Sequence, residues 1–309
     1  MTCVLITGAG GAVGSALLQE LGETDMDVVA TDVTEPDALP ANARFLALDV
    51  RGTDPDRVIG AERPEVVIHL ASIVSPTTRD VAHAVDVVGS RNAIDACLAH
   101  GVKRLVVTSS GAAYGYHADN PDWLCETDPV RGNAEFPYAD HKRQVEEMLA
   151  ETRRTAPQLE QVVFRVGTVL GAGLENQITA LFHKPRLLAL HGNDSPFVFI
   201  WTRDLARALR RAIADGPAGI YNVAGDGALG IPDIAGALGK PVLRLPPALL
   251  KLALGIARPL GLSRYGPEQV RFLQYRPVLD NAALKSDFGY VPELSSAEVF
   301  ELWRKAAGL

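Results

Sequence analysis

The chain has 309 residues, of which 47% are hydrophobic and 22% charged, and its formal net charge is −7. This is the composition of a globular protein with an ample core, and no basic stripe points to nucleic acid as a partner. No apolar run reaches the roughly 20 residues of a membrane-spanning helix, and the apolar residues 249–262 are interrupted by Lys251, Gly255, Arg258 and Pro259. We therefore expect no membrane partner, and we also expect no signal peptide. Three scattered cysteines fit neither a disulfide framework nor a zinc site, which favours a cytoplasmic enzyme without a metal.

The first predicted element is a buried strand over residues 4–6, followed by a glycine-rich turn and a helix from residue 15. Gly8, Gly11 and Gly14 recur at every third position in this turn. The first permits a tight turn, the second lets a pyrophosphate approach the backbone, and the third lets the helix pack on the strand. The helix N-terminus then favours an anion. A glycine triplet alone is also typical of an ordinary turn.

A second predicted strand over residues 28–32 ends in Asp32. A carboxylate roughly 20 residues after the glycines can accept hydrogen bonds from the adenosine ribose of a dinucleotide. No Lys or Arg follows in residues 33–37, so a 2′-phosphate would meet negative charge there. The sequence therefore favours NAD over NADP.

Predicted strands and helices alternate through the first half of the chain, which indicates an α/β fold with a Rossmann-type, doubly wound parallel sheet. The strands are expected at 44–48, 65–70, 104–108 and 161–166, and the helices at 82–100 and 138–152.

After Gly167 this alternation loosens, and only a helix over Thr202–Ala214 and a strand over Gly219–Val223 are expected to return to the sheet. We therefore expect residues 1–167, completed by about 197–224, to form an NAD-binding domain. Residues 168–196 and 225–309 would then form a smaller C-terminal substrate-binding lobe.

The fifth strand runs into Thr108, Ser109 and Ser110. The carboxyl ends of strands in an open α/β sheet face the ligand crevice, so these hydroxyls can point at a cofactor. Serine is also a common cap of an ordinary turn.

Tyr138 and Lys142 are four residues apart in a predicted helix and therefore share one face. A tyrosine normally titrates near pH 10, and a nearby ammonium favours its phenolate form. Such a tyrosine can serve as acid or base near neutrality. Without its context, the pair is equally typical of ordinary surface residues.

Together these motifs resemble the extended short-chain dehydrogenases/reductases, the group of NAD-dependent epimerases and dehydratases. The resemblance spans nearly the whole chain. The matching residues are Thr7-Gly8-x-x-Gly11-x-x-Gly14, Asp32, Asp49-Val50, His69-Leu70-Ala71-Ser72, Asp86-x-x-Gly89-x-x-Asn92, Thr108-Ser109-Ser110 with Tyr114-Gly115, Tyr138-x-x-x-Lys142, Arg165, Thr202-x-Asp204-Leu205-Ala206 and Tyr221-Asn222-Val223.

The resemblance implies a role for each site residue. Tyr138 would be the acid/base, Lys142 its tuner and a ribose ligand, and Ser110 a hydrogen-bond partner of the reacting oxygen. The residues implied to bind NAD are Gly8, Gly11, Ala12, Val13, Gly14, Asp32, Asp49, Val50, Leu70, Ala71, Ser72, Thr108, Tyr138 and Lys142. Related enzymes pair two helices into a dimer interface, so we expect a homodimer through residues 82–99 and 138–152.

The substrate side departs from the sugar-nucleotide epimerases of this group. Phe197 stands about where those enzymes carry a phosphate-binding arginine, although Phe197 and Trp201 could equally be core residues. Arg271 or Arg276 could replace a second such arginine, but residues 265–279 are predicted to be a helix with different spacing. This lobe therefore looks closer to 3β-hydroxysteroid dehydrogenases and ketoreductases. A polar insertion at 120–133 either overhangs the substrate or is a solvated loop.

The predicted activity is NAD-dependent hydride transfer at a secondary alcohol or ketone of a small molecule, either sugar-like or an apolar ring compound. One alternative is a nucleotide-sugar epimerase, similar to UDP-glucose 4-epimerase, that keeps its NAD tightly bound. The other is a non-catalytic dinucleotide sensor. The presence of Ser110, Tyr138 and Lys142 argues against the sensor, which would need none of them.

Overall fold

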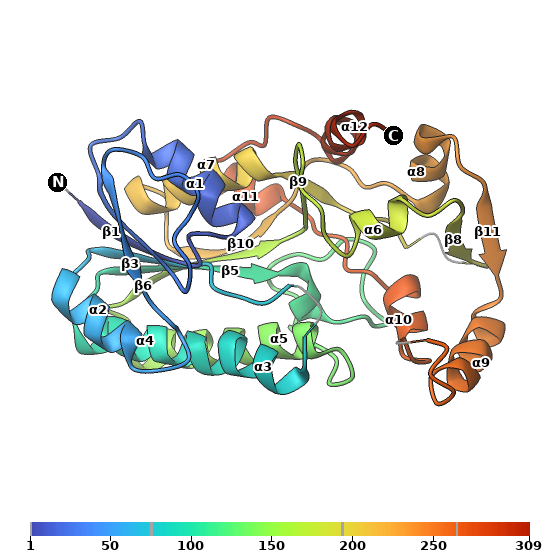
Figure 1. The fold of residues 1–309 in the computed structure, drawn as a ribbon, viewed down its shortest axis with the longest axis horizontal. Helices are drawn as coiled ribbons and strands as arrows, with labels where there is room; N and C mark the ends of the chain where they lie inside the picture. Colours follow the sequence, from blue (N-terminus) through green and yellow to red (C-terminus); the bar gives the residue numbers. More distant parts are fainter. Residues whose placement is uncertain (1, 75–76, 193–194, 264) are drawn as a thin grey trace.

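The computed structural model describes residues 2–74, 77–192, 195–263 and 265–309. In this part of the chain, seven strands form one parallel sheet in the order β10-β6-β5-β4-β1-β2-β3 (Figure 1). The strands are β1 (Cys3–Thr7), β2 (Asp27–Asp32), β3 (Ala43–Ala47), β4 (Val66–His69), β5 (Arg104–Ser110), β6 (Glu160–Val166) and β10 (Gly219–Val223). This sheet confirms the predicted α/β fold of Rossmann type.

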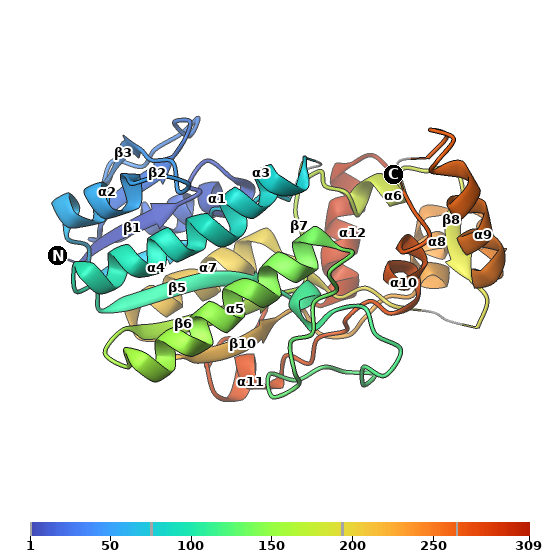
Figure 2. The same ribbon diagram turned by 90° about the horizontal axis from the view of Figure 1, so that it is seen from below.

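Helices cover both faces of the sheet, which explains why its strands are nearly continuous apolar runs. Buried side chains of α1 (Ala12–Leu21), α7 (Thr202–Ala214) and α11 (Ala282–Ser286) pack on one face. Those of α2 (Asp54–Glu62), α4 (Gly89–Ala99) and α5 (Pro137–Thr155) pack on the other. Figures 1 and 2 show the two helical layers on opposite sides of the strands.

The order in which successive strands are added to the sheet reverses at β1, although all the strands are parallel. This strand pairs with β2 on one side and with β4 on the other, so the two halves of the sheet grow away from it. In open α/β sheets, ligands bind in the crevice outside the carboxyl ends of the strands at such a reversal. Thr7, Asp32 and His69 end the three strands that meet there.

The helix predicted over residues 82–100 is longer and less regular than expected. It consists of α3 (Arg79–His83), a π-helical turn η1 (Ala84–Val88) and α4. The π turn carries Asp86, whose side chain is buried. Single π turns of this kind are frequent at functional sites. Gly101 ends the element with a φ of 69°, a conformation that favours glycine.

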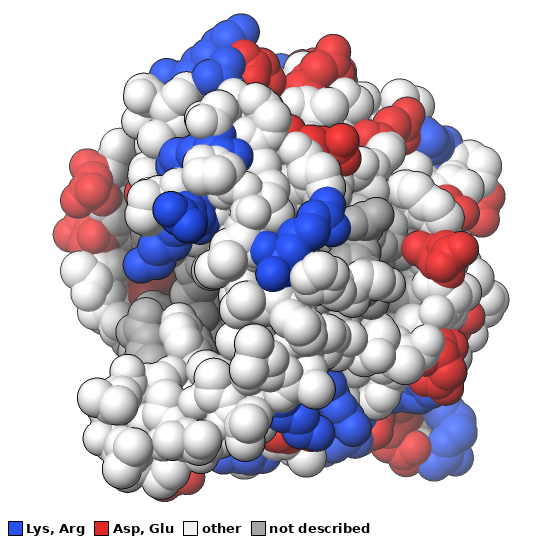
Figure 3. All heavy atoms as spheres, turned by 90° about the vertical axis from the view of Figure 1, so that its right-hand side faces the viewer, with Lys and Arg blue, Asp and Glu red and all other residues white. Residues whose placement is uncertain are grey.

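A smaller lobe lies beyond the carboxyl ends of the strands (Figure 1). Its core is aromatic, with Phe182, Phe197, Phe199, Phe300 and Trp303 buried together. The lobe contains β7 (Thr168–Leu170), α6 (Thr179–Phe182), β8 (Leu187–Leu190), β9 (Phe199–Trp201), α8 (Ile231–Leu238), β11 (Val242–Leu245), α9 (Pro247–Ala257), α10 (Gln269–Gln274) and α12 (Ser296–Ala306). Figure 3 shows its outer side.

The helix predicted over residues 265–279 is wrong for most of its length. Only α10 is helical, and the chain is extended after it. Pro277 explains the end of the helix, because proline lacks an amide proton and disfavours helical geometry at the preceding residue. Arg276 therefore lies outside the helix in which it was predicted.

A buried ion pair fixes α5 to the sheet. The Arg165 guanidinium of β6 donates to the Glu146 carboxylate of α5, with an Nη2–Oε2 distance of 2.7 Å. Ser109 of β5 donates to the same carboxylate at 2.6 Å. A further nitrogen of Arg165 donates to the Tyr114 hydroxyl at 2.8 Å. Each charge thus has several partners, which a buried ion pair needs to offset its desolvation cost.

We predict that Glu146→Gln will destabilise the fold by about 3–5 kcal/mol, because it leaves the Arg165 charge buried without a counter-ion. Urea unfolding followed by circular dichroism measures this loss. The control is Glu151→Gln, which removes an exposed ion pair with Arg154 on the same helix and should cost at most about 1 kcal/mol. Similar, small losses for both variants would contradict this account of α5.

Candidate active site

The glycine-rich turn lies tightly against the ends of two strands. Gly8 has a φ of 73°, and a Cβ there would lie 2.7 Å from the backbone nitrogen of Ala71. A Cβ at Gly14 would lie 2.4 Å from the Gly8 carbonyl oxygen. At Gly11, which precedes α1, a Cβ would meet only that carbonyl oxygen, at 3.4 Å. Gly8 and Gly14 are therefore required by packing, whereas Gly11 leaves open space beside the helix N-terminus.

Asp32 holds its carboxylate beside this turn. One oxygen accepts from the backbone nitrogen of Gly10 at 3.0 Å and the other from that of Val33 at 2.7 Å. No Lys or Arg of the described ranges forms an ion pair with it. The carboxylate is therefore oriented by the backbone and stays half-exposed.

The two residues implied to flank an adenine differ in their surroundings. The Asp49 carboxylate is held by the Arg51 guanidinium at 2.6 Å, and these hydrogen bonds lower the pKa of Asp49. Val50 is buried and lies where a Cβ on Gly89 would be, so Gly89 permits this contact. Asn92 donates to the Val50 carbonyl oxygen at 2.8 Å.

Tyr138 and Lys142 lie on the same face of α5, as their spacing predicts. The buried ammonium of Lys142 lies 5.6 Å from the centre of the Tyr138 ring and donates to the Thr108 carbonyl oxygen at 3.0 Å. The contact of Thr108 with Lys142 is therefore made by the backbone carbonyl group of Thr108. Ser110 follows two residues along β5, and its hydroxyl accepts from the backbone nitrogen of Ala112 at 3.1 Å, capping the short helix η2 (Gly111–Tyr114).

His69 lies fully inside this edge of the sheet as a neutral imidazole. Ser90 donates its hydroxyl proton to the Asp86 carbonyl oxygen, so it can only accept from Nε2 of His69, at 3.0 Å. Nδ1 then accepts from the Thr7 hydroxyl at 2.8 Å. Burial, together with the Lys142 charge, lowers the pKa of His69 to about 4.

The structure brings together Asp86 and His141, a pair that the sequence did not indicate. One Asp86 oxygen accepts from the Ser72 hydroxyl and from the Ile73 backbone nitrogen, each at 2.9 Å. The other lies 3.0 Å from Nδ1 of His141, which sits between Tyr138 and Lys142 on α5. Asp86 therefore ties the chain after β4 to the helix that carries the predicted acid/base. No local pattern could reveal a contact across 55 positions.

Arg276 is a deeply buried cation at the start of the substrate side. Its guanidinium lies 3.9 Å from the centre of the Phe197 ring and donates to the Ser195 carbonyl oxygen. Its Nη1 is buried without a hydrogen-bond partner, and within the described residues no carboxylate pairs with it. Burial accordingly lowers the pKa of Arg276 to about 9. A negatively charged ligand would supply the missing partner.

The aromatic residues of the substrate side have different positions. Phe197 is buried and stacks on Phe199 with a ring-centre distance of 5.8 Å, so it is a core residue that also faces Arg276. Trp201 is only partly buried. The 120–133 insertion is a loop anchored by Leu124, which is buried and forms a bridge with Leu279. It is therefore not a simple solvated loop.

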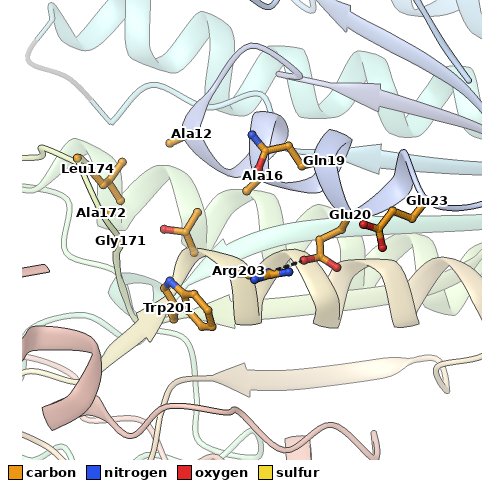
Figure 4. Close-up of a pocket in the computed structure, with 12 residues that line it drawn as sticks. Ala12, Ala16, Gln19, Glu20, Glu23, Gly171, Ala172, Leu174, Trp201 and Arg203 are labelled. Atoms are coloured by element: carbon orange, nitrogen blue, oxygen red, sulfur yellow. Dashed lines mark hydrogen bonds and ion pairs between the residues drawn. The ribbon is translucent and has the colours of Figure 1, made fainter. Parts of the chain in front are cut away.

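Two cavities of ≈ 660 Å³ lie near these residues. One is bounded by α1, the loop at 171–174 and the start of α7, and Glu20 pairs with Arg203 across it (Figure 4). Of the predicted cofactor residues it contains only Ala12. The other lies between α9, α10 and the chain at 116–119, and its wall includes Tyr116. The Tyr116 ring packs on Phe272 with a ring-centre distance of 5.3 Å, and the Arg276 guanidinium lies 5.6 Å from the centre of the same Phe272 ring, so this second cavity lies near Arg276.

Comparison with known proteins gives one family and several distant relatives. The sequence profile of the NAD-dependent epimerase/dehydratase family matches residues 4–224. An uncharacterised protein of Mycobacterium tuberculosis is 24% identical over 317 residues, covering 99% of this chain and 84% of its own length. The decarboxylating sterol-4-α-carboxylate 3-dehydrogenase of Saccharomyces cerevisiae is 28% identical over 214 residues, covering 64% of this chain and 60% of its own length.

Solved structures share the fold over the full chain. The UDP-glucose 4-epimerase of Thermotoga maritima, determined with UDP-glucose, has a TM-score of 0.77 and 20% identity, covering 99% of each chain. The UDP-glucose 4-epimerase of Thermus thermophilus, determined with NAD, has a TM-score of 0.76 and 22% identity, covering 99% of this chain and 98% of its own. At this level of identity the likeness establishes the common architecture.

We predict that His69 makes stability depend on pH below neutrality. The unfolded chain binds a proton at His69 below pH 6.5, whereas the folded protein does so only near pH 4, so acidification favours unfolding. Between pH 7 and 4.5 this should remove roughly 2–3 kcal/mol from the free energy of unfolding. Urea titrations of wild type and His69→Gln measure the difference, and the variant should lack this part of the loss.

A second measurement keeps this prediction testable if His69→Gln does not fold. In an NMR titration of the wild type, the His69 ring should remain neutral at pH 5.5, with its proton on Nε2. Protonation of His69 near pH 6.5 would contradict the assignment.

Proposed function

The chain belongs to the NAD-dependent epimerase/dehydratase family, and on that premise we propose that it is an NAD-dependent oxidoreductase. It would transfer a hydride at a secondary alcohol or ketone of a small-molecule substrate. The observation that carries the proposal is the buried Lys142 ammonium beside the Tyr138 ring. The same ammonium donates to the Thr108 carbonyl oxygen of β5, two residues before Ser110. A protein that only binds a dinucleotide could use Lys142 to hold the ribose, but it would not need the Tyr138 hydroxyl and Ser110 beside it.

The glycine-rich turn and the ends of β2 and β4 fit a bound NAD. Gly11 leaves open space at the N-terminus of a ten-residue helix, where free backbone amides favour a pyrophosphate. Asp32 presents a half-exposed carboxylate beside this turn, suited to ribose hydroxyls. Residues 70–72 and Val50 would line the remaining length of the cofactor. When bound, NAD supplies the hydride acceptor, and the protein supplies position and proton transfer.

In this proposal Tyr138 takes the proton from the substrate hydroxyl during oxidation and returns it during reduction. Ser110 donates a hydrogen bond to the same substrate oxygen, because its hydroxyl proton is not donated to any described residue. Lys142 is held by the Thr108 carbonyl oxygen, so its charge stays close to the tyrosine. Asp86 and His141 are positioning residues, which fix the helix between Tyr138 and Lys142 against the chain after β4.

The division of labour between the two lobes and the assembly belong to the same proposal. Residues 1–167 with about 197–224 would bind NAD, and residues 168–196 and 225–309 would bind the substrate. At the boundary, the aromatic side chains of Phe197 and Phe199 pack into the core of the smaller lobe. A homodimer would form through α4 and α5. The exposed side chains of Val81 and Val88, on the helical element that runs into α4, support such an interface.

A second candidate function is that of a nucleotide-sugar epimerase with tightly bound NAD. The buried Arg276, which lacks a carboxylate partner among the described residues, favours a substrate with a negatively charged group such as a diphosphate. Two measurements on the same purified protein distinguish the two candidate functions. An oxidoreductase forms NADH with a secondary alcohol, whereas an epimerase keeps its nucleotide through purification and interconverts UDP-sugars without net NADH formation.

We predict that NAD binds at least tenfold more tightly than NADP, because Asp32 would repel a 2′-phosphate and no ion pair neutralises it within the described residues. Asp32→Ala should reduce this preference by weakening NAD more than NADP. Isothermal titration calorimetry with both nucleotides measures the ratio. Equal affinities of the wild type would rule out this role for Asp32.

We predict that Tyr138→Phe lowers turnover by about 10²–10⁴-fold and leaves folding and NAD affinity nearly unchanged, since only the hydroxyl is lost. Lys142→Met should lower turnover and also weaken NAD, because Lys142 is expected to contact the ribose. The control is Tyr221→Phe, which removes a tyrosine hydroxyl bonded only to the Pro217 and Ala218 carbonyl oxygens. Turnover is measured with secondary alcohols and UDP-sugars, and near-normal turnover of Tyr138→Phe would refute the mechanism.

A further inference from the structure

The longest stretch without an acidic residue in the substrate lobe surrounds α9. Residues 234–267 contain no Asp or Glu, yet they contain Lys240, Arg244, Lys251, Arg258 and Arg264. The chain as a whole has a net charge of −7, so this segment is opposite in sign to the rest of the protein. Such local asymmetry matters for association with charged surfaces rather than for the fold.

The same segment carries most of the exposed large aliphatic side chains of the lobe, with Val291 as an exception outside it. Leu249, Leu252 and Ile256 are 53%, 62% and 55% exposed, and their spacing of three and four residues puts them on one face of α9. Leu260 and Leu262, in the turn that follows, are 66% and 79% exposed. No residue of α9 is buried, so the helix packs on the lobe only at its edge. A contiguous apolar stripe of this kind marks an interaction surface.

Basic residues lie beside the apolar stripe, and residues 249–262 contain no acidic residue. Figure 3 shows an uncharged bulge over α9 and the turn after it, with Lys and Arg side chains at its margin. Lys251 follows the first leucines of the stripe, and within the described residues neither Lys251 nor Arg244 forms an ion pair. Arg258 pairs with Glu268 at 3.1 Å, which lies just beyond the acid-free segment. The surface therefore combines apolar side chains with one unpaired cation, Lys251, and with Arg258, whose charge Glu268 partly offsets. Asp119, Glu135 and Glu268 line the same cavity as Lys251, on the side of α9 away from the exposed leucines.

We propose that α9 and the turn after it, residues 249–262, dock on the surface of a lipid bilayer that contains anionic phospholipid. An amphipathic helix with leucines on one face and lysine or arginine beside them lies in the interface between headgroups and acyl chains. Basic residues near such a surface add electrostatic attraction to the anionic headgroups. No helix among the described residues is long and apolar enough to cross a membrane, so α9 would lie on the bilayer.

A second copy of this chain fits the stripe less well. In a two-fold contact the same patch meets itself, so both sides of the interface would carry Lys251, a cation that forms no ion pair within the described residues. Like charges facing each other across an interface oppose association. The stripe also covers only an eleven-residue helix and a turn. The bilayer, by contrast, matches both the leucines and the cations.

Docking in this way would bring one cavity of the protein to the bilayer. Pro247, Ala248 and Lys251 of α9 form part of the wall of the cavity that Tyr116 also lines. This consequence is independent of the reaction proposed above, because lipid binding can be measured without a substrate or cofactor.

The experiment is sedimentation of the full chain with sucrose-loaded vesicles. We expect binding to phosphatidylcholine vesicles that contain a third phosphatidylserine, and at least tenfold weaker binding to phosphatidylcholine alone or in high salt. The double variant Leu252→Ser/Ile256→Ser should lower binding to the anionic vesicles tenfold or more. Lys251→Glu should lower it on anionic vesicles and change little on neutral ones. The matched control is Val291→Ser, because Val291 is equally exposed, at 66%, but lies outside the segment.

Three outcomes would overturn the proposal. The first is no sedimentation of the wild type with either vesicle, and the second is equal binding of the wild type and the double variant. The third is a concentration-dependent increase in mass by light scattering that the double variant abolishes, without vesicle binding. This last result would assign the stripe to self-association. Circular dichroism of each variant checks that the exposed substitutions leave the fold intact.

Discussion

The carboxylate of Glu146 and the guanidinium of Arg165 meet in a core from which water is excluded, and the position of α5 depends on their contact. Two buried charges are tolerated only when their remaining donors and acceptors are satisfied, which Ser109 and Tyr114 do here. Because the partners come from α5, β5 and β6, the helix can occupy only one position against these strands. Lys142 lies one turn before Glu146 on α5, so the same contact orients the predicted acid/base pair.

A second group of polar contacts lies at the carboxyl ends of the strands and fixes the side chains there. Thr7, His69 and Ser90 are joined in one hydrogen-bonded series that ends on the Asp86 carbonyl oxygen. The Asp86 carboxylate continues the connection to His141 on α5. Hydrogen bonds of this kind fix the orientation of the side chains that they join, although Nε2 of His141 is buried without a partner among the described residues. The edge is therefore organised by directional bonds, while the helical layers behind it are held by apolar packing.

The substrate lobe follows a different principle. Its core is a cluster of aromatic rings, and it places a buried cation, Arg276, on the face of one of them. Its outer helix α9 keeps leucines in solvent. A guanidinium that has no carboxylate partner among the described residues and an uncovered apolar stripe both cost free energy in an isolated protein. Contacts with a partner outside the chain would explain both features: an anionic ligand at Arg276, and a surface at the leucines of α9.

The sequence by itself determined the features that depend on neighbouring residues. The spacing of the glycines, the acid at the end of β2, the i,i+4 pair on α5 and the bounds of α7 and β10 follow from local periodicity and backbone sterics, which act over a few positions. The helix expected at 265–279 was wrong for a local reason, because the prediction gave no weight to the helix-breaking Pro277.

Tertiary structure alone decided which distant polar groups meet. The pairs of Asp86 with His141 and of Glu146 with Arg165, and the burial of Arg276 against Phe197, depend on contacts across tens of residues. The same side chains would be unremarkable on a surface. Partner choice in a core is set by the desolvation of each group and by the geometry that the whole fold imposes, neither of which is encoded in local spacing.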